Sequence, residues 1–310
     1  MKPADGLRLL RRQAVAPLRQ RILTVLRGSP SARLSIDYSQ PVGDPGLFGP
    51  DSVTWKIHSD FPAMMAGGIC ALMLQTLHPS ALAGVWDHSD FREDVLGRLR
   101  RTTAFVAGTT YAPTAGAEGL IEQVRNIHRR VRGTAPDGSA YSADDPELLT
   151  WVHVTEMWSF LQGYRRHVAP DLDRALADRY FDETRCIAEA LGAREVPGSV
   201  AAVDQYFEAV RGQLEFSARS REVLAVLNRI ELPMPGATAV RGTFLGAGAA
   251  LLPDWAAQLL GRTALRRARD RAAQRALRAA SPAIRLALAD GASAVACRRV
   301  GRDRSALAFG

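Results

Sequence analysis

Residues 124–133 have the sequence VRNIHRRVRG, and the interpretation of the whole chain starts from them. If this stretch is helical, Arg125, His128 and Arg132 lie at positions i−3, i and i+4 of one helix face. A neutral imidazole can bind a metal through a ring nitrogen, and guanidinium groups bind carboxylates as forks. A haem group offers both partners, an iron and two propionates. The spacing is therefore compatible with a haem site centred on His128.

The same residues have a simpler interpretation. Arg125, Arg129, Arg130 and Arg132 form a run of positive charge, and such runs are usually solvated surface. His128 would then be a histidine whose hydrogen bonds are satisfied by its neighbours. The spacing alone favours this second interpretation.

The composition describes a folded chain with a sizeable core. Of its 310 residues, 47% are hydrophobic and 23% are charged, which excludes a disordered protein. The formal net charge of +8 permits nucleic acid, anionic lipid or acidic substrates as partners without choosing among them. The sequence has no zinc-finger spacing and no aromatic RNA-binding signature, so we expect no nucleic-acid partner.

The cysteines and the apolar segments indicate the cellular compartment and whether the chain crosses a membrane. Cys70, Cys186 and Cys297 are far apart in the sequence and suggest neither a disulfide framework nor a metal site. The basic N-terminus does not resemble a signal peptide, and the nearest candidate membrane span, residues 242–260, is interrupted by glycines, a proline and Asp254. We therefore predict a cytoplasmic protein without a transmembrane segment, with weak membrane-surface contact as an open alternative.

The chain is expected to divide into a short arm and one large body. Residues 1–46 are predicted to be an N-terminal basic helical arm and loop, with a helix over residues 7–28 that breaks or kinks at Pro17. No repeat or low-complexity linker follows, so residues 47–310 are predicted to form a single all-α domain. Later helices are expected near residues 171–191, 199–217, 219–229, 254–279 and 281–300.

Two helices of the body have informative sequences. The helix over residues 63–77, begun by Asp60 and Pro62, is apolar nearly all round and should be buried. Gly67 and Gly68 destabilise it, which is explained either by another helix packed closely or by a large flat ligand. A second helix is expected to open within residues 142–147, with Pro146 in its first turn, and it carries His153 near Glu156. The chain has no Glu-x-x-His motif, which argues against a di-iron bundle, so His153 is expected to be a hydrogen-bonding residue.

Several motifs together resemble the MpaB and latex-clearing-protein family, the rubber oxygenases, whose characterised members contain haem b. Arg125, His128 and Arg132 match, residue for residue, the Arg-x-x-His-x-x-x-Arg helix that carries the proximal histidine of rubber oxygenase. The resemblance extends from about residue 47 to 168, and more weakly to the end. Its other motifs, in the family's order, are Gln75, His78-Pro79, Asp87-His88-Ser89, Tyr141 and Trp151-Val152-His153.

The resemblance also implies a distal side of the haem. Rubber oxygenase has Arg-x-x-Lys-Thr at this place, and Arg98, Arg101 and Thr102 take the corresponding positions. A deprotonated lysine can coordinate iron, whereas arginine stays protonated and has no lone pair to give, so we predict no sixth ligand from Arg101. Without the resemblance, these residues would equally be a surface arginine cluster.

The resemblance implies that residues 47–310 are an oxygenase-like catalytic domain with a buried haem pocket, for which a globin-like core is one arrangement. His128 would bind the iron of haem b, and Arg125 and Arg132 would hold the haem edge or its propionates. The expected activity is that of an oxygenase or oxidase that uses dioxygen on an apolar small molecule, isoprenoid-like or another natural product. A haem carrier or sensor without turnover and a cofactor-free interaction protein are the alternatives.

Overall fold

The computed structural model describes residues 13, 15–25 and 36–309. Nearly all of its secondary structure is helical, which confirms the predicted all-α fold. The described chain has one small sheet, in which β1 (Arg132–Thr134) pairs antiparallel with β2 (Ala140–Ser142). The helices are α2 (Val53–His58), α3 (Phe61–Gln75), α4 (Pro79–His88), α5 (Val95–Tyr111), α6 (Thr114–His128), α7 (Pro146–His167), α8 (Arg174–Leu191), α9 (Val200–Val210), α10 (Ala218–Leu227), α11 (Ala237–Ala249), α12 (Asp254–Leu259), α13 (Ala264–Ala287) and α14 (Ala292–Arg299).

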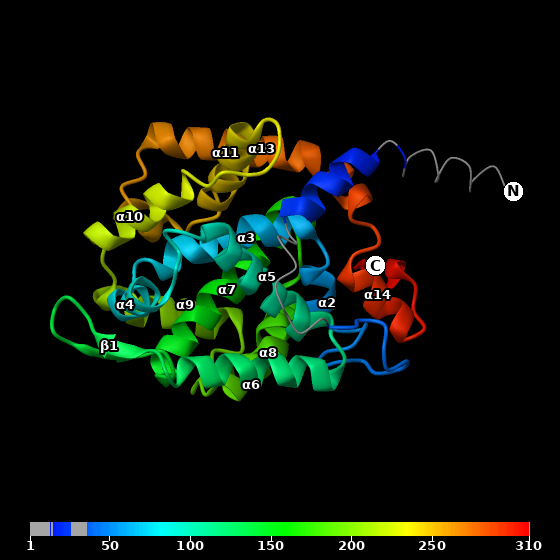
Figure 1. Ribbon diagram of the computed structural model, residues 1–310, viewed down its shortest axis with the longest axis horizontal. Coiled ribbons are helices and arrows are strands. Elements are labelled where there is room, and N and C mark those ends of the chain that lie inside the picture. Colours follow the sequence, from blue (N-terminus) through cyan, green and yellow to red (C-terminus); the bar gives the residue numbers. More distant parts are fainter. Residues whose placement is uncertain (1–12, 14, 26–35, 310) are drawn as a thin grey trace, which may run out of the picture.

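Helix α3 is at the centre of the molecule, as its apolar sequence predicts. Asp60 caps its first turn by accepting a hydrogen bond from the Ala63 amide, and Pro62 follows in that turn. α3 packs against α7, α11 and α13. Figure 1 shows α11 and α13 above α3, and α6 and α8 along the lower side of the molecule.

The two central glycines of α3, Gly67 and Gly68, have different surroundings. A Cβ atom on Gly67 would lie 2.8 Å from the Ser159 carbonyl oxygen and 2.9 Å from the Phe160 Cα, so Gly67 permits close contact with α7. A Cβ atom on Gly68 would meet only the edge of the Phe160 ring, at 3.7 Å. Helix packing therefore explains Gly67, while Gly68 faces open space.

Residues 124–133 are only partly helical. α6 ends at His128, and Arg132 belongs to strand β1, so the prediction that Arg125, His128 and Arg132 share one helix face is wrong. Gly133, the last residue of this stretch, pairs with Tyr141 in the sheet, where a Cβ atom would lie 2.6 Å from the tyrosine hydroxyl. Hydrogen bonding to β2 therefore competes with the helix and ends it four residues early.

Two predictions for the C-terminal half also need correction. Ser281-Pro282 was expected to separate two helices, but Pro282 lies inside α13, which runs on to Ala287. Helix α11 was not predicted, because its three glycines suggest a broken segment. Two of those glycines permit close packing instead: a Cβ atom on Gly246 would lie 2.6 Å from Ala273 of α13, and one on Gly248 would lie 2.5 Å from Ile69 of α3.

The arm lies partly outside the described residues. Residues 15–25, with Pro17 near their start, are helical, while the remainder of the helix predicted over residues 7–28 falls mostly in residues that are not described. The boundary at residue 46 stays a prediction. Among the described helices, none is by itself long and apolar enough to cross a membrane; α3 and α4 would pass only as a pair, and they are bent by 103°.

Candidate functional site

A large cavity lies beside α3, between α5, α6 and α7. Its volume is about 1010 Å³, at the upper end of the range of about 300–1,000 Å³ that is common for small-molecule sites. Most of its wall is apolar, as expected for a pocket that takes an apolar ligand. Side chains of this kind on the four helices include Leu72, Val106, Val124, Val152, Met157 and Phe160.

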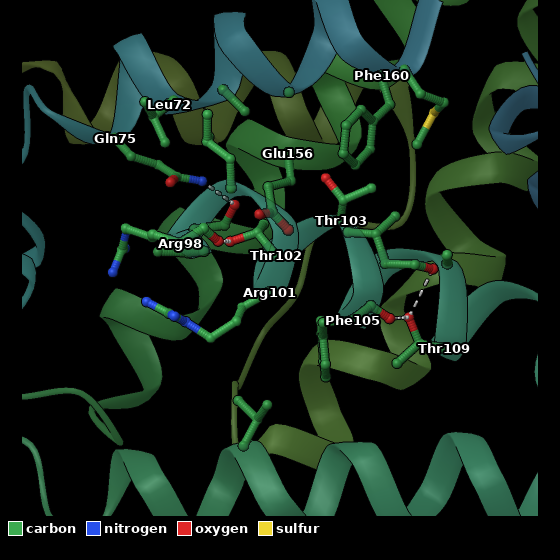
Figure 2. A pocket seen from close by; sticks show the side chains of 18 of the residues that line it. Leu72, Gln75, Arg98, Arg101, Thr102, Thr103, Phe105, Thr109, Glu156 and Phe160 are labelled. Carbon is green, nitrogen blue, oxygen red and sulfur yellow. Dashed lines mark hydrogen bonds between the residues drawn. The ribbon is translucent and has the colours of Figure 1, made fainter. Parts of the chain in front are cut away.

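Helix α5 contributes the three residues that were predicted to be distal. Arg98, Arg101 and Thr102 line the cavity on one side of α5, and Figure 2 shows them around the same space. Arg98 Nη1 donates to Ser89 Oγ at 3.0 Å, and the Thr102 hydroxyl donates to the Arg98 carbonyl at 3.2 Å. The Arg101 guanidinium is half exposed and lies 3.5 Å from Asp94. Their catalytic roles stay predictions.

Glu156 of α7 is a cavity residue to which the sequence interpretation gave no role. Figure 2 shows its carboxyl group near Thr102, with Gln75 and Arg98 in the same part of the wall. Burial raises the pKa of Glu156 to about 7, while hydrogen bonding from Gln75 and the charge of Arg98 act in the opposite direction. One signal was present in the sequence, because a carboxylate in the middle of a largely buried helix needs an explanation.

His128 lines the cavity from the last turn of α6. Its Nδ1 atom is buried without a partner, and within the described residues neither ring nitrogen makes a hydrogen bond. Burial lowers the pKa of His128, against the smaller opposing effect of Asp144, so the ring is neutral at pH 7. A neutral imidazole without hydrogen bonds is available as a metal ligand.

His153 of α7 is a second imidazole on the cavity wall. Burial lowers its pKa to about 4, and the described residues offer it no hydrogen bond, so the expectation that it is a hydrogen-bonding residue is not met. Two other cavity histidines are bonded. The His58 nitrogens lie 2.8 Å from Thr110 Oγ1 and 2.8 Å from Tyr180 Oη, and His88 Nε2 lies 3.2 Å from the Arg132 carbonyl.

Arg125 and Arg132 are not part of the cavity wall. Arg125 is half exposed and lies 3.9 Å from Glu122 on its own helix. Arg132 turns its guanidinium to the Arg129 carbonyl. Their predicted contact with haem propionates stays a prediction, and their positions give it no support. Arg98 and Arg101 do line the cavity, and the charge of Arg98 acts on Glu156.

These residues fit the haem group that the resemblance implies. The cavity is large and apolar, a neutral imidazole lies on its wall, and two guanidiniums are present that can bind carboxylates. The site does not have the composition of a bare metal centre. Among the described residues, no group of three or more His, Cys, Asp or Glu side chains could hold a metal ion.

Comparison with known families gives one match. Residues 55–286, well over half of the chain, match a family model described as "ER-bound oxygenase mpaB/B'/Rubber oxygenase, catalytic domain". The chain belongs to this oxygenase family. No curated protein and no solved structure matches it, so a globin-like core stays a prediction. The predicted family is thus confirmed, and membership supports an oxidoreductase. The matched region contains the cavity residues of α5, α6 and α7.

Proposed function

We propose that this member of the mpaB/rubber oxygenase family is a haem b-dependent oxygenase that acts on an apolar small molecule with dioxygen. One observation carries the proposal. His128, at the histidine position of the family's Arg-x-x-His-x-x-x-Arg pattern, lies on the wall of a large apolar cavity with a neutral ring that makes no hydrogen bond. A satisfied surface histidine would have neither property.

The chain's own residues would hold the haem in a simple way. A ring nitrogen of His128 would be the protein ligand, and the Arg98 and Arg101 guanidiniums are the nearby partners for carboxylates. When bound, the haem supplies the redox chemistry of dioxygen, for which the protein sets ligation, polarity and access. The leucine, valine and phenylalanine side chains around it exclude water and accept an apolar substrate.

Glu156 is the group in this site that can move a proton at neutral pH. A carboxyl group with a pKa near 7 is about equally populated in its protonated and ionised forms, which is the condition for general acid–base chemistry. Thr102 and Arg98 lie on the facing wall of the same space (Figure 2). We assign Glu156 as the residue that gives or takes a proton at the substrate.

The first test is the visible spectrum of the full-length protein, expressed with sufficient haem precursor. We expect a Soret band and one haem b per chain by the pyridine haemochromogen assay. A protein that stays colourless after reconstitution with haemin would contradict the haem assignment. Oxygen uptake with isoprenoid test substrates then separates an oxygenase from a haem carrier, which would show a Soret band without substrate-dependent uptake.

The substrate class has its own test. A series of isoprenoid alcohols of increasing length should bind with affinity that rises with each added unit, because the wall is apolar. Polar analogues of the same size should bind more weakly. Equal binding of both series would show that the wall does not select apolar molecules.

A further inference from the structure

Two segments of the chain are strongly basic, residues 1–35 and residues 237–287. Residues 237–287, which include α11, α12 and α13, contain nine arginines and two aspartates, a formal charge of +7 within this segment. Both aspartates are already paired. Asp254 lies 2.6 Å from Arg267, and Asp270 binds Arg262 through two contacts. The charge on the remaining arginines is therefore not neutralised within this segment.

The exposed side of α13 presents these arginines in an ordered way. Small exposed alanines, among them Ala272 and Ala276, occupy the outermost face, and exposed arginines flank them on both sides. Such a face is flat, and its long cationic side chains can reach a flat anionic surface. The flanking arginines, none in an ion pair within the described chain, are Arg269, Arg271, Arg275 and Arg278.

Two exposed leucines lie close in sequence to the start of α13. Leu259, the last residue of α12, is 36% exposed, and Leu265, near the start of α13, is 62% exposed. Few large hydrophobic side chains in the described chain are as exposed as these. Exposed leucines beside arginines are typical of surfaces that enter the headgroup region of a bilayer.

We propose that the outer face of α13, with Leu259 and Leu265, docks the protein on an anionic lipid bilayer. The arginines would bind headgroup phosphates, and the two leucines would enter the acyl boundary. A nucleic acid would use the arginines but gives the leucines no partner, so lipid fits the whole surface better. The proposal goes beyond the oxygenase function and does not depend on haem.

The test is flotation of the full-length protein with vesicles of phosphatidylcholine, with and without phosphatidylglycerol. We expect binding only to the anionic vesicles, weakened by added salt because the contact is electrostatic. The double variant Arg269→Gln/Arg275→Gln should bind about 30-fold more weakly, since each basic side chain near such a surface contributes about fivefold. Leu265→Ser should weaken binding as well, with little change in salt dependence.

A matched control is available on the other side of the molecule. Arg174→Gln/Arg194→Gln removes the same charge from exposed positions at the two ends of α8, which Figure 1 shows on the lower side, away from α13. The control should bind anionic vesicles like the wild type. An equal loss in the control, or equal binding to neutral vesicles, would overturn the proposal. Tighter binding to a duplex DNA fragment than to anionic vesicles would overturn it in favour of nucleic acid.

Discussion

The contact between α3 and α7 is tightly packed, whereas the cavity beside it is open, and the neighbouring residues Gly67 and Gly68 lie on these two sides of α3. Gly67 lies against the backbone of α7, where no side-chain atom fits, whereas Gly68 lines the cavity. Adjacent residues of one helix thus serve opposite purposes. Close packing on one side fixes α3 and α7 relative to each other, and the other side can then stay open without loss of the fold.

Two histidines of the cavity wall, His58 and His128, differ in their hydrogen bonding. Each ring nitrogen of His58 has a hydrogen-bond partner, and burial lowers the pKa of His58 to about 3. His128, at the cavity wall, is also neutral but has no partner. An imidazole that stabilises the fold is satisfied inside the protein. One that lacks partners on a cavity wall is available to a ligand.

The largest effect is expected at His128. His128→Ala should abolish stoichiometric haem binding, because it removes the proposed iron ligand. His153→Ala is the control, since His153 is also neutral, unbonded and on the cavity wall. The haem content of both purified variants is measured by the pyridine haemochromogen assay. If His153→Ala loses haem and His128→Ala keeps it with an unchanged spectrum, the ligand assignment is reversed.

Glu156 should make stability depend on pH. Its pKa is about 7 in the folded protein and about 4.5 when unfolded, so the folded state holds the proton more tightly. Stability is then greatest below the unfolded value and falls as pH rises through 7, by up to about 3 kcal/mol. Urea unfolding of wild type and Glu156→Gln at about pH 4 and about pH 8, which lie on either side of that range, measures this.

The Glu156→Gln variant should lose most of this decline while it retains the shape of the side chain. The same variant should also lower oxygen uptake and flatten its pH profile near 7, as removal of a proton-transfer group requires. A pH dependence of stability that is the same in both proteins would place the titrating group elsewhere.

The two glycines of α3 provide a matched pair of substitutions. Gly67→Ala should destabilise the fold by about 1–3 kcal/mol, because its Cβ atom would collide with backbone of α7. Gly68→Ala should be neutral or stabilising by up to about 1 kcal/mol, since alanine favours the helix and the new atom finds space. Thermal unfolding of both variants measures the change in stability. Destabilisation of similar size in the two variants would show that both glycines are needed for packing.

The smallest effect on stability is expected at Arg101, which is half exposed. Arg101→Lys should leave the melting temperature unchanged, yet it supplies a side chain that has a lone pair when deprotonated. In the haem-loaded protein we expect a new six-coordinate, low-spin species in the EPR spectrum at high pH. An unchanged five-coordinate spectrum at all pH values would mean that Arg101 does not face the iron position.

Several residues of the cavity wall could be predicted from the sequence once its motifs were matched to the family. Arg98, Arg101 and Thr102 share a wall because they occupy adjacent turns of one helix, and His128 reaches the same cavity from α6. The prediction of the helix end failed because a contact with residues farther along the chain determines where α6 stops. Arg132 leaves the helix because β1 pairs with β2, a contact that helix periodicity does not contain.

The sequence by itself determined most of the helices, although not α11, together with the Asp60 cap, the buried character of α3 and the family, because these depend on residue types a few positions apart. Only the tertiary structure decided that Gly67 packs while Gly68 stays open, and that Glu156 faces Arg98 across the cavity. Glu156 is an ordinary carboxylate in the sequence. Its pKa near 7 arises from burial among helices that are far apart in the chain, and such burial exists only once they have packed.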